Sequence, residues 1–270
     1  MYRVIFRTVF AIFILSGLLS TLALVAQAPA TTPEAKATPT PAVNADKIAG
    51  FNAWQKAREE QMKNDWPWLG RFKEADLKLA APVAGEDRVV FMGDSITEFW
   101  KIEGAKGYFP GKPYINRGIS GQTTPQMLVR FRQDVIDLKP KVVVILAGIN
   151  DIAGNTGPMT LKETEDNLAS MAELATANRI HVVMCSVLPA FDFSWKPGMN
   201  PAPKVVALNE WIKAYAAEKG HVYVDYYTTM KDDRGGLPTA LSEDGVHPLP
   251  AGYAIMTPLV EAGIEKALKR

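Results

Sequence analysis

The feature that most constrains the fold is an alternation of short apolar runs with helical stretches from residue 87 to the C-terminus. The apolar runs predict five strands, at 88–92, 114–116, 141–146, 180–187 and 221–226. Helices are expected between and after them, at 124–138, 160–178, 203–218 and 250–269. The run KVVVIL at 141–146 is unbroken by polar residues, which is typical of a strand buried on both faces. This order predicts one α/β domain with a parallel sheet and helices on both faces.

Turns rich in Gly, Asp, Ser and Asn fall where such a sheet would place a binding site. Three of them follow predicted strands, at 93–95 (GDS), 118–123 (GISGQT) and 148–151 (GIND). A fourth, DGVH at 244–247, precedes the last helix. Each turn alone has the composition of an ordinary loop. Ligands of open parallel sheets bind outside the carboxyl ends of the strands, so the four turns together predict a site at that edge.

Ser95, Asp244 and His247 have the chemistry of a hydrolytic triad. A serine hydroxyl is a weak nucleophile until a base removes its proton, and an imidazole can be that base because it titrates near neutral pH. Asp244 precedes His247 by a single turn and can fix its tautomer. The other histidines, His181 and His221, fall at strand starts, on the opposite edge of the sheet.

An ester hydrolase also needs hydrogen-bond donors for the oxyanion of its tetrahedral intermediate. The backbone N–H of Ser95 is one candidate. Gly121 is a second, because a residue without Cβ lets the backbone approach a substrate closely. The side-chain amide of Asn150 is a third. Asn150 also fits an ordinary turn residue, and its composition alone does not decide between the two.

These blocks together resemble the SGNH (GDSL) hydrolase superfamily over about residues 86–270. The matching blocks are GDS at 93–95, the glycine block at 118–121, GxND at 148–151 and DxxH at 244–247. The resemblance implies Ser95 as nucleophile, His247 as base and Asp244 as its orienting acid. It implies an oxyanion hole of Ser95, Gly121 and Asn150, and a three-layer α/β/α sandwich with a flavodoxin-like parallel sheet of about five strands.

The N-terminal region has a different composition. Residues 1–30 are typical of a secretory signal peptide, with Arg3 and Arg7 before an apolar run and small residues near the end; an uncleaved membrane anchor is the alternative. Residues 31–49, rich in Ala, Pro and Thr, predict a flexible linker. Residues 50–85 are expected to form an arm packed on the domain. We therefore expect an exported protein, periplasmic or secreted, that meets a membrane only through an uncleaved leader.

Aromatic residues near the predicted site are candidates for substrate binding. Phe191, Phe193 and Trp195 alternate with polar residues in the loop after the fourth strand, and Trp100 follows the nucleophile turn. They could flank the cleft and stack on a sugar or acyl group, or pack on one another. No long apolar lid is evident in the sequence, which favours short acyl groups.

The sequence thus predicts a serine esterase for short-chain esters, O-acetylated saccharides among them, acting through an acyl-serine intermediate. A lysophospholipase or thioesterase, a saccharide O-acetyltransferase, and a carbohydrate-binding protein on the same scaffold are the alternatives. A formal net charge of +1 without basic runs argues against nucleic acid as the main partner. No motif predicts a metal or cofactor, and the lone Cys185 cannot form an internal disulfide. Nothing in the sequence predicts an oligomeric state.

Overall fold

The computed structural model of the chain describes residues 45–100 and 108–270. The predicted signal peptide or anchor, and the predicted linker up to residue 44, lie outside the described residues. Helix α1 spans Ala45–Asn64, so residues 45–49, which we expected in the linker, are helical instead. The chain divides into two units, 1–48 and 49–270.

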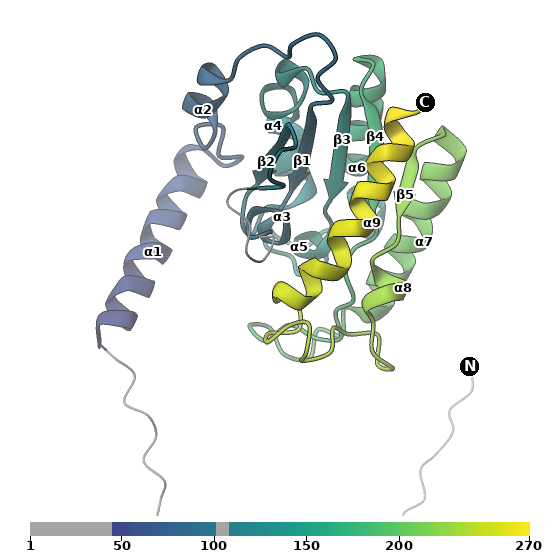
Figure 1. Cartoon of the computed structure of the whole chain (residues 1–270). Coiled ribbons are helices and arrows are strands. Elements are labelled where there is room, and N and C mark those ends of the chain that lie inside the picture. The colour runs from purple at the N-terminus through teal and green to yellow at the C-terminus, as the bar shows by residue number, and fades with distance from the viewer. Residues whose placement is uncertain (1–44, 101–107) are drawn as a thin grey trace, which may run out of the picture. The chain divides into compact units, whose positions relative to one another are not determined.

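The sheet of the second unit has five parallel strands in the order β2-β1-β3-β4-β5 (Figure 1). The strands are β1 Val89–Gly93, β2 Tyr114–Gly118, β3 Val142–Leu146, β4 His181–Cys185 and β5 Val222–Val224. The predicted parallel sheet of about five strands is confirmed. The fourth strand is shorter than expected, because the backbone N–H and C=O of Val187 bond to the side chain of Asn209 instead of to a neighbouring strand.

Helices cover both faces of the sheet, which confirms the predicted three-layer α/β/α sandwich. Helix α9 (Pro250–Leu268) crosses one face over β3, β4 and β5, whereas α4 (Thr124–Asp134), α6 (Leu161–Ala177) and α7 (Ala202–Lys219) pack side by side on the other (Figure 1). The shorter elements are α2 Lys73–Lys78, α3 Ser95–Glu98, η1 Ile136–Leu138, α5 Ile149–Ile152 and α8 Tyr227–Met230. Within residues 45–100 and 108–270, every helix is too short or too polar to span a bilayer.

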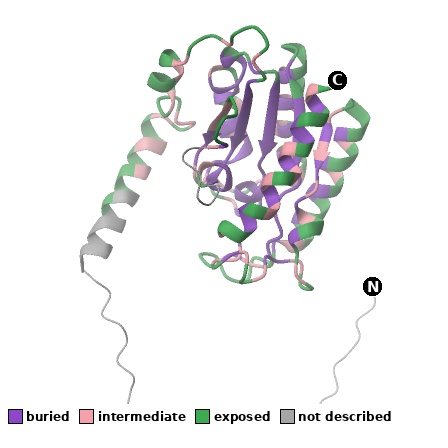
Figure 2. Cartoon of the chain, viewed as in Figure 1, coloured by how far each residue is buried: buried purple, intermediate pink, exposed green. Residues whose placement is uncertain are grey.

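The core lies between the sheet and its helices, and the strands are its centre (Figure 2). Every residue of β1 and β3 is buried, as expected for strands that are covered on both faces. Removing this much apolar surface from water is the main contribution to the stability of such a domain. The sheet is therefore a rigid support for whatever its edges carry.

The register of the sheet brings three strand ends level with one another. Gly93, the last residue of β1, pairs with Gly118 of β2 on one side and with Leu146 of β3 on the other. The turns that follow these residues therefore leave the same edge. Gly93 is required here by space, since a Cβ at this position would overlap the Thr97 hydroxyl of α3. The close approach places the start of α3 directly at the end of β1.

The segment from 50 to 85 lies against the domain through hydrogen bonds to the side chains of three glutamines in and before α4. Gln122 donates to Pro67 O at 2.7 Å, Gln126 to Trp66 O at 2.6 Å and Gln133 to Leu69 O at 2.8 Å. The three accepting carbonyls belong to residues close together in sequence, just after the end of α1. The last turns of α1 are thereby held at the edge of the sheet where α4 begins.

Candidate active site

Ser95 is placed by the junction of β1 and α3. It is the first residue of α3, and Asp94 before it caps the helix by accepting a hydrogen bond from Ile96 N at 3.0 Å. The side chain of Ser95 is buried apart from a small exposed area at the cleft. Its Oγ lies 2.9 Å from Nε2 of His247, across 152 positions of sequence. The two ends of the domain therefore meet at this hydroxyl.

Asp244 holds His247 from two directions. Its Oδ2 lies 2.6 Å from His247 Nδ1, and its Oδ1 accepts the backbone N–H of Val246 at 2.9 Å and that of His247 at 2.8 Å. Partial burial would raise the pKa of Asp244, but the hydrogen bonds from His247 and the backbone outweigh it and keep the pKa below its usual value. Asp244 is therefore a carboxylate at neutral pH and can stabilise a positively charged imidazole.

Two residues at the cleft, Ser95 and Gly121, have backbone N–H groups without an acceptor among the described residues. Gly121 lines the cleft with Ser95 and has φ +74°, a left-handed conformation that glycine adopts without strain. Both N–H groups are thus available to an oxyanion.

The third expected donor, Asn150, is engaged differently. It lies in α5 after β3, and its Nδ2 donates to Gln122 O at 3.0 Å and to Asp94 Oδ2 at 3.2 Å. Its Oδ1 accepts from Asn155 Nδ2 at 2.8 Å. These bonds fix the orientation of the amide at the cleft. The contact with Asp94 is the longer of the two that Nδ2 donates, and it is the one more easily given up to another acceptor.

Buried charged groups support the site from behind. Arg130 of α4 is fully buried, bonds to the Asp134 carboxylate at 2.9 Å, and donates to the carbonyls of Gly93 at 3.2 Å and Arg117 at 2.8 Å. It therefore ties the end of β1 to the neighbouring strand. Burial raises the pKa of Asp94 to about 7, against the opposing effect of the Ile96 N–H.

These residues open into a cleft of about 630 Å³, within the size range of small-ligand sites. Ser95, Gly121, Asn150 and His247 all line it. Trp195, another predicted residue, also lines the cleft. The remaining lining residues were not predicted as part of a site; they are Arg58, Met62, Phe99, Ser120, Asn155 and Val246. Phe99 and Asn155 follow predicted motifs closely in sequence, so their position in the sequence could have indicated that they lie at the site. Arg58 and Met62 belong to α1, where no local pattern indicated a site.

Comparison with known proteins agrees with this geometry. The sequence model of the GDSL-like Lipase/Acylhydrolase family matches residues 91–255, more than half of the chain. The chain belongs to this family. A GDSL-like lipase from Bacteroides thetaiotaomicron is 46% identical to this GDSL hydrolase, with a TM-score of 0.72, and the match covers 75% of the chain and all of that structure.

Two characterised relatives are esterases by name. The acetylxylan esterase of Geobacillus stearothermophilus is 27% identical over 204 residues, which cover 64% of this chain and 92% of the relative. Esterase TesA of Pseudomonas aeruginosa is 28% identical over 185 residues, 64% of this chain and 85% of the relative. Together with the family match, the similarity to these relatives shows that the GDSL hydrolase is a carboxylic ester hydrolase.

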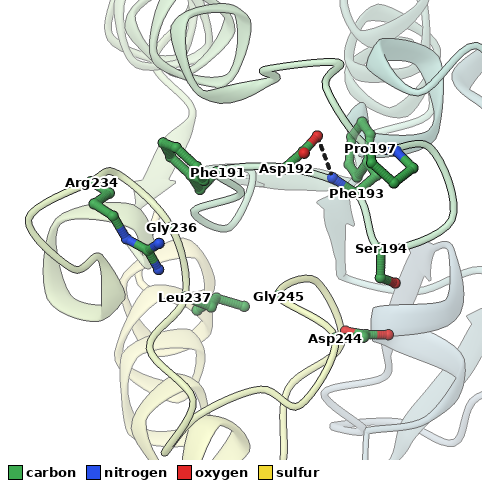
Figure 3. A pocket seen from close by; sticks show the side chains of 10 residues that line it. All are labelled: Phe191, Asp192, Phe193, Ser194, Pro197, Arg234, Gly236, Leu237, Asp244 and Gly245. Atoms are coloured by element: carbon green, nitrogen blue, oxygen red, sulfur yellow. Dashed lines mark hydrogen bonds between the residues drawn. The ribbon is translucent and has the colours of Figure 1, made fainter. Parts of the chain in front are cut away.

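The four aromatic residues that were expected at the cleft of the GDSL hydrolase lie in different places. Trp195 is 43% exposed, lines the cleft, and has its ring centroid 6.3 Å from that of His247. Phe193 is buried and stacks beneath Trp195, with centroids 5.1 Å apart. Phe191 lies at a second pocket next to Asp244, where Arg234 covers its ring (Figure 3). Of the three loop aromatics, only Trp195 lines the cleft.

The prediction that Trp100 lines the cleft is wrong. Its side chain is 3% exposed and packs in the core against Phe91, Phe109 and Tyr253, at centroid distances of 5.9, 5.7 and 5.5 Å. Helix α3 is only one turn long, and the backbone N–H of Trp100 bonds to Thr97 O at 3.3 Å just after it. The residue that faces the cleft is its neighbour Phe99.

Proposed function

We propose that this GDSL hydrolase is a serine esterase that cleaves short-chain carboxylic esters through an acyl-serine intermediate. One observation carries the proposal: a hydrogen-bonded chain runs from Ser95 through His247 to Asp244 and opens into a cleft beside two N–H groups, those of Ser95 and Gly121. A hydroxyl, an imidazole and a carboxylate in this order are the parts that acyl transfer to serine requires.

In the first half of the reaction, Ser95 Oγ attacks the ester carbonyl carbon while His247 Nε2 accepts the hydroxyl proton. The resulting oxyanion takes hydrogen bonds from the backbone N–H groups of Ser95 and Gly121. Asn150 Nδ2 adds a third when its bond to Asp94 is released. The carbon–oxygen bond to the alcohol then breaks, His247 gives its proton to the leaving oxygen, and an acyl-serine remains.

The second half repeats these steps with water. His247 accepts a proton from a water molecule, which attacks the acyl carbon and forms a second oxyanion at the same donors. When the bond from the acyl carbon to Ser95 Oγ breaks, the proton returns from His247 to Oγ. The products are the free alcohol and the carboxylic acid, and the enzyme is regenerated.

As the natural substrate class we propose O-acetylated saccharides. Trp195 presents a partly exposed aromatic ring near His247, and the exposed amide of Asn155 lies at the same cleft. An exposed ring beside polar groups suits the alternation of apolar faces and hydroxyls on a sugar. The similarity to a protein named acetylxylan esterase supports this class.

The test is a series of p-nitrophenyl esters with acyl chains from acetyl to dodecanoyl, measured on the native enzyme and on Ser95→Ala. We expect the acetyl ester to be the better substrate and Ser95→Ala to lose about 10³-fold or more in kcat. Unchanged turnover in Ser95→Ala contradicts the mechanism. Faster turnover of the dodecanoyl ester contradicts the short-acyl preference and favours a lipid acylhydrolase.

We also propose that the chain is exported through residues 1–30. The support is the sequence of the leader, with basic residues before an apolar run. Expression of the whole chain in a Gram-negative host, followed by N-terminal sequencing, tests it. We expect a soluble mature protein that begins after Ala30, whereas a membrane-bound protein of full mass contradicts cleavage and indicates an anchor.

A further inference from the structure

Helix α1 contributes a fixed cation to the cleft. Among the described residues that line it, Arg58 is the only one with a permanent charge. It lies outside residues 91–255, to which the family match extends, so family membership says nothing about its role. A half-buried guanidinium at the wall of a substrate cleft calls for a physical explanation, because removing a charge from water is unfavourable unless a partner compensates for it.

Neutral groups of the protein hold Arg58 in place. Nη2 donates to Ser120 O at 3.1 Å, and Nη1 donates to Gln61 Oε1 at 2.9 Å. The guanidinium also lies over the ring of Trp68, 5.2 Å from its centroid. An arginine held by a carbonyl, an amide and an aromatic face is oriented in advance and retains its whole charge.

The loop after α1 is built to keep Trp68 at this position. The Asp65 carboxylate accepts the backbone N–H groups of Leu69 and Gly70, both at 2.8 Å, which turns the chain back toward the helix. Trp68 itself has φ +57°, a conformation that is uncommon for a bulky residue. The surrounding hydrogen bonds must compensate for that strain, so the support under Arg58 is a specified part of the fold.

Arg58 is also close to the predicted oxyanion site. Its Nη2 lies 3.5 Å from the position that a Cβ on Gly121 would occupy. No carboxylate of the described residues forms an ion pair with it. The acid with most influence on its charge is Glu98, whose carboxylate is already bound to Ser120 and Arg71. The guanidinium therefore lines the cleft with N–H groups beyond the two that bond to Gln61 and Ser120, and without an ion pair among the described residues.

We propose that Arg58 is a specificity-determining residue that binds an anionic substituent, such as a carboxylate, on the ester that the site cleaves. A guanidinium with two or more free N–H groups binds a carboxylate through paired, charge-assisted hydrogen bonds. The inference rests on the proposed esterase function and narrows its substrate class to acidic esters, of which an O-acetylated acidic saccharide is an example. The anion can belong to the alcohol part or to the acyl part of the ester.

Two matched pairs of esters test the inference and distinguish these two positions. For the alcohol part, 4-acetoxybenzoate is compared with the neutral 4-acetoxybenzamide. For the acyl part, monoethyl succinate is compared with ethyl succinamate. In one of the pairs we expect the native enzyme to prefer the anion by roughly tenfold to a hundredfold in kcat/KM, as a charged hydrogen bond implies. The preference should fall to about one in Arg58→Gln.

Arg132→Gln is the control variant, because it removes the same charge from an exposed position by the loop that precedes β3, away from the cleft. It should keep the native preference. Absence of preference in both pairs, or an equal preference in Arg58→Gln, overturns the inference. So does an equal loss in Arg132→Gln, since it would show an effect of net charge alone.

A measurement on the native enzyme covers the case in which Arg58→Gln does not fold. Between about 0.02 and 0.5 M NaCl, screening should reduce the preference for the anionic ester while the neutral ester is hydrolysed at a nearly constant rate. A preference that does not change with salt contradicts the role of Arg58. Loss of hydrolysis of the neutral ester in Ser95→Ala tests the esterase function separately, so the two proposals can fail independently.

Discussion

The residues that line the cleft have two origins, and the two sets differ in how they are held. The sheet-edge set, Ser95, Gly121 and Asn150, follows the ends of three adjacent parallel strands. The added set, Arg58, Met62 and Trp195, comes from the end of α1 and from the loop after β4. The sheet-edge set lies within the family match, and Arg58 and Met62 lie before it.

We expect the sheet-edge set to serve the reaction itself and the added set to select the substrate. The sheet edge is fixed by buried strands and by Arg130, and it holds the proposed nucleophile and oxyanion donors, whereas the proposed base and acid, His247 and Asp244, precede α9. The part of the added set that comes from α1 is attached through two buried glutamine side chains, Gln122 and Gln126, which bind backbone carbonyls just after α1. Variation in such segments can change the substrate without disturbing the chemistry. We therefore expect substitutions in the first set to reduce the rate with every ester, and those in the second to change which ester is preferred.

The largest effect is expected at Asp244, the proposed acid that orients His247. In Asp244→Asn the imidazole loses its charged partner and is held in the wrong tautomer, so kcat for p-nitrophenyl acetate should fall by roughly 10³- to 10⁴-fold. Asp233→Asn, at an exposed position, should retain full activity. A loss of less than tenfold in Asp244→Asn contradicts the proposed role of the carboxylate.

Trp100 tests the boundary between the site and the core behind it. Because its side chain fills a packed position, Trp100→Ala should lower the free energy of unfolding by about 3–5 kcal/mol, measured by urea denaturation. Trp195→Ala, which truncates an exposed ring, should change it by less than about 1 kcal/mol. Equal losses in the two variants would contradict the different placements of these tryptophans.

Asn150 tests whether a donor that is already bonded still serves an oxyanion. Removal of one such donor typically costs about 2.7–4 kcal/mol of transition-state stabilisation, so Asn150→Ala should lose about 10²- to 10³-fold in kcat. Asn155→Ala removes the group that orients the Asn150 amide, and it should have a smaller effect. If Asn150→Ala retained native kcat, the Asn150 amide would have only a structural role.

The smallest effect belongs to the added set. Trp195→Ala removes an exposed ring beside His247, and KM for an acetylated xylo-oligosaccharide should rise roughly two- to tenfold while kcat stays nearly constant. Phe191→Ala, at the second pocket, is the matched control and should leave KM unchanged. A fall in kcat with unchanged KM in Trp195→Ala would place that ring in the reaction instead of in binding.

The succession of strands along the chain and the positions of the sheet-edge groups could be predicted from sequence for a physical reason. Parallel strands all present their carboxyl ends at one edge, so a motif placed after each strand is also placed in space. Ser95, Gly121 and Asn150 follow β1, β2 and β3 in this way. The short spacing between Asp244 and His247 allowed their contact to be expected as well.

The added set could not be predicted in the same way. Whether an aromatic ring points into the core or the cleft depends on contacts between distant segments. Trp100, which was expected at the cleft, packs in the core, and its neighbour Phe99, for which no role was predicted, lines the cleft. Arg58 is held at the cleft by its own bond to Ser120 O and by the bonds of Gln122 and Gln126 to the backbone that follows α1. Nothing in the sequence distinguishes this use of Gln122 from that of an ordinary turn residue, or this use of Gln126 from that of an ordinary helix residue.

Covalent labelling can show whether Ser95 is the nucleophile of this cleft. The native enzyme is incubated with a p-nitrophenyl alkylphosphonate, which forms a stable ester with an activated serine, and is then analysed by intact mass and peptide mapping. We expect a single adduct on Ser95, activity lost in proportion to labelling, and no adduct in Ser95→Ala. Labelled protein that keeps its activity, or an adduct on another residue that alone removes activity, would contradict the proposed role of Ser95.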